Sequence, residues 1–163
     1  MDQALEEMSK DSIPAGFHPY YRDDLFYKSV GPMFVRYMAG KMSFGLRVAE
    51  KHCNAAMICH GGVLATLMDM QVGVSSCVEE DVTAFVPTVN LTCDFLAPAK
   101  IGDWVEARSN VVQKTRRMIF AQGVLEVDGL PILRGNGIVK IPSNSEFPDE
   151  FAKMIPPEYV PED

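Results

Sequence analysis

The chain has 163 residues, a length typical of one domain. Hydrophobic residues make up 47% of it and charged residues 23%, which supplies a folded core and excludes a wholly disordered chain. The formal net charge of −7 argues against a nucleic-acid-binding protein.

Most of the acidic excess lies at the two ends. Residues 142–163 hold six acidic side chains, one lysine and five prolines, and residues 1–12 hold four acidic side chains and one lysine. Such ends are typical of solvated tails. We therefore expect an N-terminal extension over residues 1–30, a folded domain over 31–141 and a Pro-rich acidic tail over 142–163.

Residues 1–30 combine a short predicted helix over 4–10 with an aromatic cluster that we expect to pack on the domain. Its members are Tyr20, Tyr21, Phe26 and Tyr27. A hairpin is predicted next, over strands 33–38 and 42–48 around Gly40.

Residues 61–78 read as a helix, because apolar side chains cover nearly every face of it, and such a helix is normally buried all round. Alternating strands follow over 83–95, 104–114, 118–127 and 131–141. Asp128-Gly129, between the last two, is the strongest hairpin signal in the chain. The economical α+β architecture is an antiparallel sheet wrapped around the central helix.

The four cysteines, at positions 53, 59, 77 and 93, have neither C-x-x-C nor zinc-finger spacing. The polar N-terminus resembles no secretory signal, so we expect free thiols and a cytoplasmic protein. No membrane span is expected, because the longest apolar run, 63–78, is short and contains Asp69.

Asp69 is the one charged residue within the predicted helix. An unpaired buried carboxylate costs several kcal/mol, so Asp69 has either a structural partner or a function. The segment before the helix favours function. It ends in His60-Gly61-Gly62, where backbone N–H groups at a helix N-terminus bind developing negative charge.

Gly61 and Asp69 are too far apart in one helix to act on one atom. Eight residues correspond to roughly 12 Å along the helix axis. A second, antiparallel copy of the helix would bring Asp69 of one chain towards Gly61 of the other, so the geometry predicts a dimer.

These motifs resemble the PaaI-like family of hotdog-fold acyl-coenzyme A thioesterases. The resemblance rests on Asn54, on His60-Gly61-Gly62, on Asp69 and on the phrase from Thr88 to Asp103. It covers about residues 30–141 and implies a hotdog fold and hydrolysis of an acyl-coenzyme A to a free acid and coenzyme A. It also implies a homodimer assembling to a homotetramer.

The resemblance further implies site roles. Asp69 would be the nucleophile or general base, and the Gly61 amide would polarise the thioester carbonyl. Asn54 and His60 would shape that site, and Thr88 would help to hold the water. We favour a capping or packing role for His60 over acid–base catalysis.

Coenzyme A binding is expected at Gly62 and at the one basic cluster of the domain, Lys114, Arg116 and Arg117. Guanidinium groups suit phosphate oxygens, although a short charge run is by default a solvated turn. No metal and no separate cofactor are expected. A zinc site from His52, His60 and Asp69 lacks regular spacing.

A Cys59–His60 nucleophile is discounted, because adjacent residues in an extended segment point opposite ways. Two other functions stay open: a hotdog acyl-coenzyme A hydratase or dehydratase, and a non-catalytic acyl-coenzyme A-binding protein. The acyl group is not fixed by the sequence.

Overall fold

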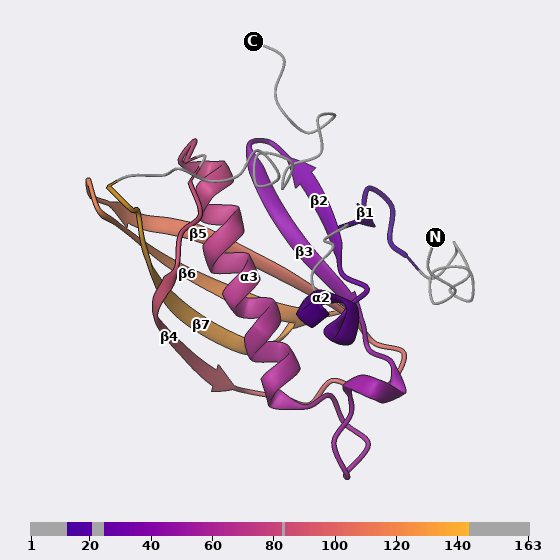
Figure 1. Ribbon diagram of the computed structural model, residues 1–163. Coiled ribbons are helices and arrows are strands. Elements are labelled where there is room, and N and C mark those ends of the chain that lie inside the picture. Colours follow the sequence, from indigo (N-terminus) through magenta and orange to yellow (C-terminus); the bar gives the residue numbers. More distant parts are fainter. Residues whose placement is uncertain (1–12, 21–24, 83, 144–163) are drawn as a thin grey trace.

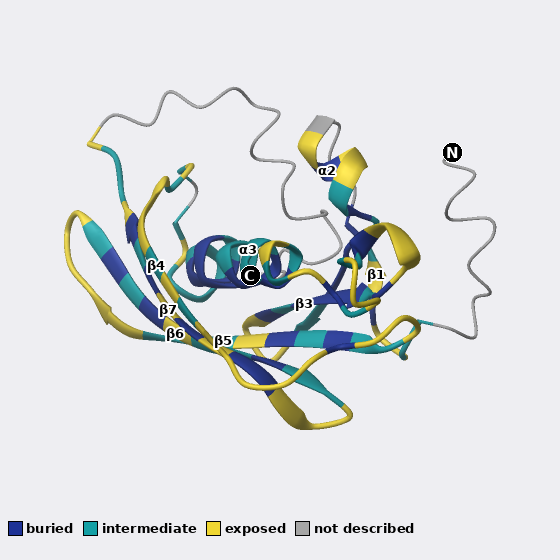
Figure 2. Cartoon of the chain, turned by 90° about the horizontal axis from the view of Figure 1, so that it is seen from below, coloured by how far each residue is buried: buried dark blue, intermediate teal, exposed yellow. Residues whose placement is uncertain are grey.

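The computed structural model describes residues 13–20, 25–82 and 84–143. The predicted helix over 4–10, Tyr21 and most of the C-terminal tail therefore lie outside the described residues. The chain builds one antiparallel sheet that curls around a central helix (Figures 1 and 2). This is the architecture that the sequence predicts.

Over the described residues the sheet has seven strands in the order β1-β2-β3-β5-β6-β7-β4. Its strands, in chain order, are β1 (His18–Pro19), β2 (Phe34–Met38), β3 (Lys41–Arg47), β4 (Thr88–Phe95), β5 (Trp104–Lys114), β6 (Met118–Val127) and β7 (Leu130–Lys140). The helical elements are α2 (Leu25–Val30), the 3-10 turn η2 (Glu50–His52) and α3 (Gly61–Glu79). α3 fills the concave side of the sheet (Figure 2).

The long strands form where apolar and polar residues alternate. Along β7, for example, Leu133, Gly135 and Val139 are buried on the helix side, while Arg134 and Asn136 are exposed on the other. The turn into β7 has positive φ at both Asp128 (50°) and Gly129 (78°), as the predicted two-residue hairpin requires.

Three glycines let α3 approach the sheet closely. A Cβ on Gly137 would lie 2.4 Å from a methyl carbon of Val72, and a Cβ on Gly135 would lie 2.8 Å from Met68 Cγ. Gly123, opposite Gly135 on β6, also faces Met68. Because these glycines have no side chains, the sheet has room for Met68 and Val72 of α3.

The sequence predicted that α3 is buried all round. In the structure, only the side that faces the sheet is buried. Leu64, Leu67, Met68 and Val72 are buried, whereas Asp69 and its neighbours on the other side are only half-buried. By length and composition alone α3 is long and apolar enough to cross a membrane, a property that core helices of folded domains share. Its packing in the sheet accounts for that apolar character.

One strand boundary differs from the prediction. The strand expected from residue 83 begins at Thr88, and Pro87 just before it has no N–H to pair. Before residue 31, β1 pairs with β2, and Tyr20 and Tyr27 of the aromatic cluster are buried, as expected of a cluster that packs on the domain. Phe26 of that cluster is 60% exposed.

Candidate active site

The first turn of α3 has one backbone donor to spare. The N–H groups of Val63 and Leu64 donate to the carbonyl of His60 at 2.9 and 3.3 Å, and the Gly62 N–H donates to His60 Nδ1 at 2.9 Å. Within the described chain, the Gly61 N–H has no hydrogen-bond partner. It stands at the positive end of the helix, where it favours negative charge.

His60 is the N-cap of α3, so the expected capping role is confirmed. The same contact bears on Gly62. Gly62 was expected at the coenzyme A site, and its N–H already donates to the His60 ring. Gly61 is therefore the amide of this turn that remains available to a ligand.

Phe95, at the end of β4, explains why residue 61 is a glycine. A Cβ on Gly61 would lie 3.0 Å from Phe95 Cε1 and 3.3 Å from its Cζ. The ring thus lies against the bare backbone of Gly61, while Phe95 as a whole is 56% exposed. We expected no role for Phe95 from the sequence, although it lies in the phrase that carries the family resemblance.

Asn54 closes the loop that leads into this helix. Its side-chain oxygen accepts from the Ala56 N–H at 2.9 Å, and its backbone N–H donates to the Ile58 carbonyl at 2.9 Å. The next residue, Cys59, donates its N–H to the Ala99 carbonyl at 2.8 Å and so fastens the loop to the body. Asn54 thus holds the turn of the loop that leads to Gly61.

Asp69 and Thr88, both predicted site residues, are in contact. The Thr88 hydroxyl donates to Asp69 Oδ1 at 2.7 Å, which leaves Oδ2 uncommitted to this contact. The carboxylate is half-buried and forms no salt bridge with any described lysine or arginine. Thr88 therefore orients a charged group that no described cation neutralises.

β4 runs antiparallel to α3, since Thr88 lies beside Asp69 in the middle of the helix and Phe95 lies beside Gly61 at its start. Between them, Leu91 and Cys93 face the core. Burial, together with the charges of Asp69 and Asp94, raises the pKa of the Cys93 thiol. The period-two spacing of residues 91, 93 and 95 is the sequence signal that would have found this face.

The basic cluster lies at the other end of α3. Lys114 Nζ donates to the carbonyl of Glu80 at 2.8 Å and lies 3.4 Å from its carboxylate. Arg116 and Arg117 are exposed on the β5–β6 hairpin and form no ion pair with the described residues. They are the free cations of the cluster, whereas Lys114 is already paired.

The structure also bears on two sites that were discounted from the sequence. Cys59 is buried, and burial raises the pKa of its thiol to about 11, which suppresses the thiolate that a nucleophile needs. His52 is enclosed, with the carbonyl of Val30 at 2.8 Å from Nε2. Among the described residues, no group of three His, Cys, Asp or Glu side chains is placed to hold a metal ion.

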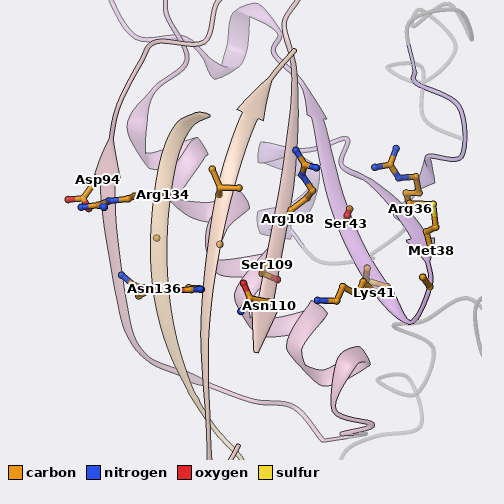
Figure 3. Close-up of a pocket in the computed structure, with 16 residues that line it drawn as sticks. Arg36, Met38, Lys41, Ser43, Asp94, Arg108, Ser109, Asn110, Arg134 and Asn136 are labelled. Carbon is orange, nitrogen blue, oxygen red and sulfur yellow. The ribbon is translucent and has the colours of Figure 1, made fainter. Parts of the chain in front are cut away.

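A cavity of about 830 Å³ lies on the opposite side of the sheet from the helix (Figure 3). None of the predicted site residues lines it. Its four cations are each paired with a carboxylate, so it offers no net positive charge. The pairs are Arg36–Glu106, Lys41–Glu79, Arg108–Glu126 and Arg134–Asp94.

Comparison with known proteins gives a consistent result. The family profile described as "Thioesterase superfamily" matches residues 57–129. A Pseudomonas aeruginosa protein whose name describes it as an esterase is 33% identical over 132 residues, which cover 80% of this chain and 98% of that protein. Human acyl-coenzyme A thioesterase 13 is 29% identical over 82 residues, or 50% of this chain and 57% of that protein.

Solved structures share the fold. The zebrafish thioesterase superfamily member 2 superposes with a TM-score of 0.67 at 27% identity, covering 74% of this chain and 89% of the other. The Escherichia coli PaaI protein superposes with a TM-score of 0.62 at 20% identity, covering 71% and 86%. The chain belongs to the thioesterase superfamily, as a thioester hydrolase with the hotdog fold of the PaaI-like proteins.

Proposed function

We propose that this thioester hydrolase acts on acyl-coenzyme A, with Asp69 as nucleophile or general base and the Gly61 amide as oxyanion donor. Two observations together carry the proposal. The Asp69 carboxylate is held by Thr88 and has no described cation beside it, and the Gly61 N–H at the start of α3 has no partner among the described residues. The name of human acyl-coenzyme A thioesterase 13 supports the substrate class.

The chemistry follows from these two groups. In the general-base route, Asp69 takes a proton from water, and the hydroxide formed attacks the thioester carbon. The carbonyl oxygen becomes an oxyanion, to which the Gly61 N–H donates. Collapse of this intermediate breaks the carbon–sulfur bond and releases coenzyme A thiolate, which takes up a proton.

In the nucleophilic route, Asp69 itself attacks the thioester carbon, coenzyme A leaves, and water then hydrolyses the mixed anhydride. Both routes need the charged carboxylate, and in both the Thr88 hydroxyl orients one of its oxygens. Asn54 and His60 act by fixing the loop and the cap beside Gly61.

We further propose that the site forms between two copies of the chain. β4 is an edge strand, and Val89 on it is 55% exposed. Antiparallel pairing of β4 with its copy, with Thr88 opposite Phe95 of the partner subunit, places Asp69 near Gly61 of the partner subunit. Dimerisation therefore removes the roughly 12 Å separation within one helix.

The same arrangement explains the basic hairpin. Lys114 and its two neighbouring arginines lie at the C-terminal end of α3, far from Gly61 of their own chain. In the antiparallel dimer this hairpin lies beyond the Gly61 end of the partner helix, where Arg116 and Arg117 face the phosphates of coenzyme A. Two such dimers form the homotetramer that the family resemblance implies.

The test is thiol release from a panel of acyl-coenzyme A compounds by wild type and Asp69→Asn. Thr88 can still donate to the Asn oxygen, so we expect this variant to fold and assemble but to lose nearly all turnover. Glu126→Gln, which removes a carboxylate charge on the outer side of β6 and away from β4, is the control and keeps full activity. Wild-type-like hydrolysis by Asp69→Asn contradicts the assignment.

The same assay separates the alternatives. Addition of water to an enoyl-coenzyme A without thiol release identifies a hydratase. Tight binding of acyl-coenzyme A without either reaction identifies a binding protein.

A further inference from the structure

The sheet is split between β3 and β5. These neighbours pair over only three residues of each strand, Gly45–Arg47 with Trp104–Glu106. β3 begins four residues earlier, at Lys41, and β5 continues to Lys114. Backbone groups of β3 that face the split therefore need other partners.

The side chain of Gln71, from α3, fills the split. Its Oε1 accepts from the Phe44 N–H at 2.9 Å, and its Nε2 donates to the Met42 carbonyl at 2.9 Å. The same nitrogen donates to Ser109 Oγ, on β5, at 2.9 Å. The carboxamide thus takes the place of a neighbouring strand for β3 and reaches across to β5.

Gln71 is 0% exposed and lies in the middle of the apolar, sheet-facing side of α3. Its bonds differ in kind from the contacts of its neighbours Met68 and Val72. Apolar contact is non-directional and tolerates sliding or rotation of the helix, whereas a hydrogen bond weakens steeply when its angle changes. Three bonds to two strands therefore fix the rotation and height of α3 on the sheet.

Asp69 lies two residues before Gln71, which is about 200° around the helix at 100° per residue. Gln71 faces β3 and β5, and Asp69 faces Thr88 on β4, on the other side. Any rotation of α3 at the split therefore moves the Asp69 carboxylate relative to Thr88.

We propose that Gln71 is a positioning residue, which sets the rotation of α3 and so holds Asp69 at the reacting centre. The inference rests on the proposed function of Asp69. A misplacement of about 1 Å costs on the order of 10²-fold in rate. The cavity of Figure 3 is lined by Met42 of β3 and Ser109 of β5. The two strands do not pair at these residues, so backbone hydrogen bonds between β3 and β5 cannot replace those of the Gln71 side chain.

The test compares Gln71→Met with Ser109→Ala. Gln71→Met keeps the length of the side chain but removes its three bonds. Ser109→Ala removes two bonds, the one from Gln71 Nε2 and the one that Ser109 Oγ donates to the Gln71 backbone carbonyl at 3.4 Å. At a temperature where circular dichroism shows both variants folded, we expect kcat to fall about 10- to 100-fold in Gln71→Met and less in Ser109→Ala. KM stays near the wild-type value, because neither side chain lies beside Gly61 or the basic hairpin.

Gln122→Met is the matched control, since Gln122 is exposed on the outer side of β6, and it keeps wild-type kcat. A crystal structure of Gln71→Met, or of Ser109→Ala if Gln71→Met does not fold, gives a readout independent of activity. We expect the 2.7 Å contact between Asp69 and Thr88 to lengthen or break.

An unchanged kcat per folded subunit, or an unchanged Asp69–Thr88 contact, overturns the positioning role and leaves Gln71 a purely structural residue. If wild type itself releases no thiol, the proposed function fails. The crystal structure then still decides whether Gln71 positions Asp69.

Discussion

At residue 61, the proposed chemistry depends on one group, the backbone N–H of Gly61. His60 occupies the next three amides of the helix, so the Gly61 N–H is the remaining donor of the first turn. Its glycine identity has a separate cause, because a Cβ at this position would lie 3.0 Å from the Phe95 ring. The amide and the missing side chain can therefore be tested separately.

Gly61→Pro removes the donor, and Gly61→Ala adds a Cβ but keeps the donor. Proline is well tolerated at the first helical position, and His60, with φ −63° and ψ 134°, already has the extended conformation that a residue before proline prefers. We expect kcat for thiol release to be about 10²–10³ lower in Gly61→Pro than in Gly61→Ala. Thermal unfolding should distinguish the two variants little, and equal turnover would exclude the amide as oxyanion donor.

Several residues of the candidate site could be singled out from the sequence at this scale. Asp69, Gly61 and His60 stood out because a charge in an apolar helix and paired glycines at its start are rare and have few physical explanations. Gln71 did not stand out, because a single neutral polar residue among apolar helix residues is common and does not by itself indicate a role. Its partners, the backbone of Met42 and Phe44, become visible only once the strands are placed.

Among the elements, periodicity predicted the long ones and missed the short ones. α3 and the strands from β5 to β7 were found because each spans several repeats of its own period. α2, β1 and η2 are only two to six residues long, fewer than two repeats of their periods. These short elements are stabilised by tertiary contacts, which cannot be predicted from the residue pattern of one sequence.

His52 is one such contact, since it joins η2 to the end of α2. Its Nδ1 accepts from the Ala49 N–H at 2.9 Å, so the proton is on Nε2, which donates to the Val30 carbonyl at 2.8 Å. Burial lowers the pKa of His52 below 6.5, and the hydrogen bond to Val30 only partly offsets this. The folded state thus favours the neutral ring.

The sign of the pH effect follows. The contribution of His52 to the free energy of unfolding is fully present above pH 6.5 and is lost as the pH falls from 6.5 towards the lower pKa of the folded state. Chemical denaturation between about pH 7.5 and pH 5 should show stability decreasing over this range. His52→Asn, which keeps an acceptor for Ala49, should show a flatter profile, and parallel profiles would exclude His52 as the source.

For the whole molecule, the informative feature is the surface of α3 and β4 that the described residues leave uncovered. The sheet buries one side of α3, and the other side, with Asp69, stays half-buried next to the free edge of β4. The sequence predicted a helix buried all round, which the described part of the chain does not achieve. Ala65, four residues before Asp69 and so on the same side of the helix, is also only half-buried, and a second copy of the chain on this side would cover both residues.

A mixed dimer tests the shared site directly. Asp69→Asn and Gly61→Pro are each expected to be inactive as homodimers. In a dimer with one chain of each kind, purified by two different tags, one site combines the intact Asp69 with the intact Gly61, and the other site carries both changes. If the two residues act across the interface, the mixed dimer recovers about half of the wild-type rate of thiol release, because one of two symmetric sites is restored. If they act within one chain, both sites remain defective, so a mixed dimer as inactive as its parents would reject the site between subunits.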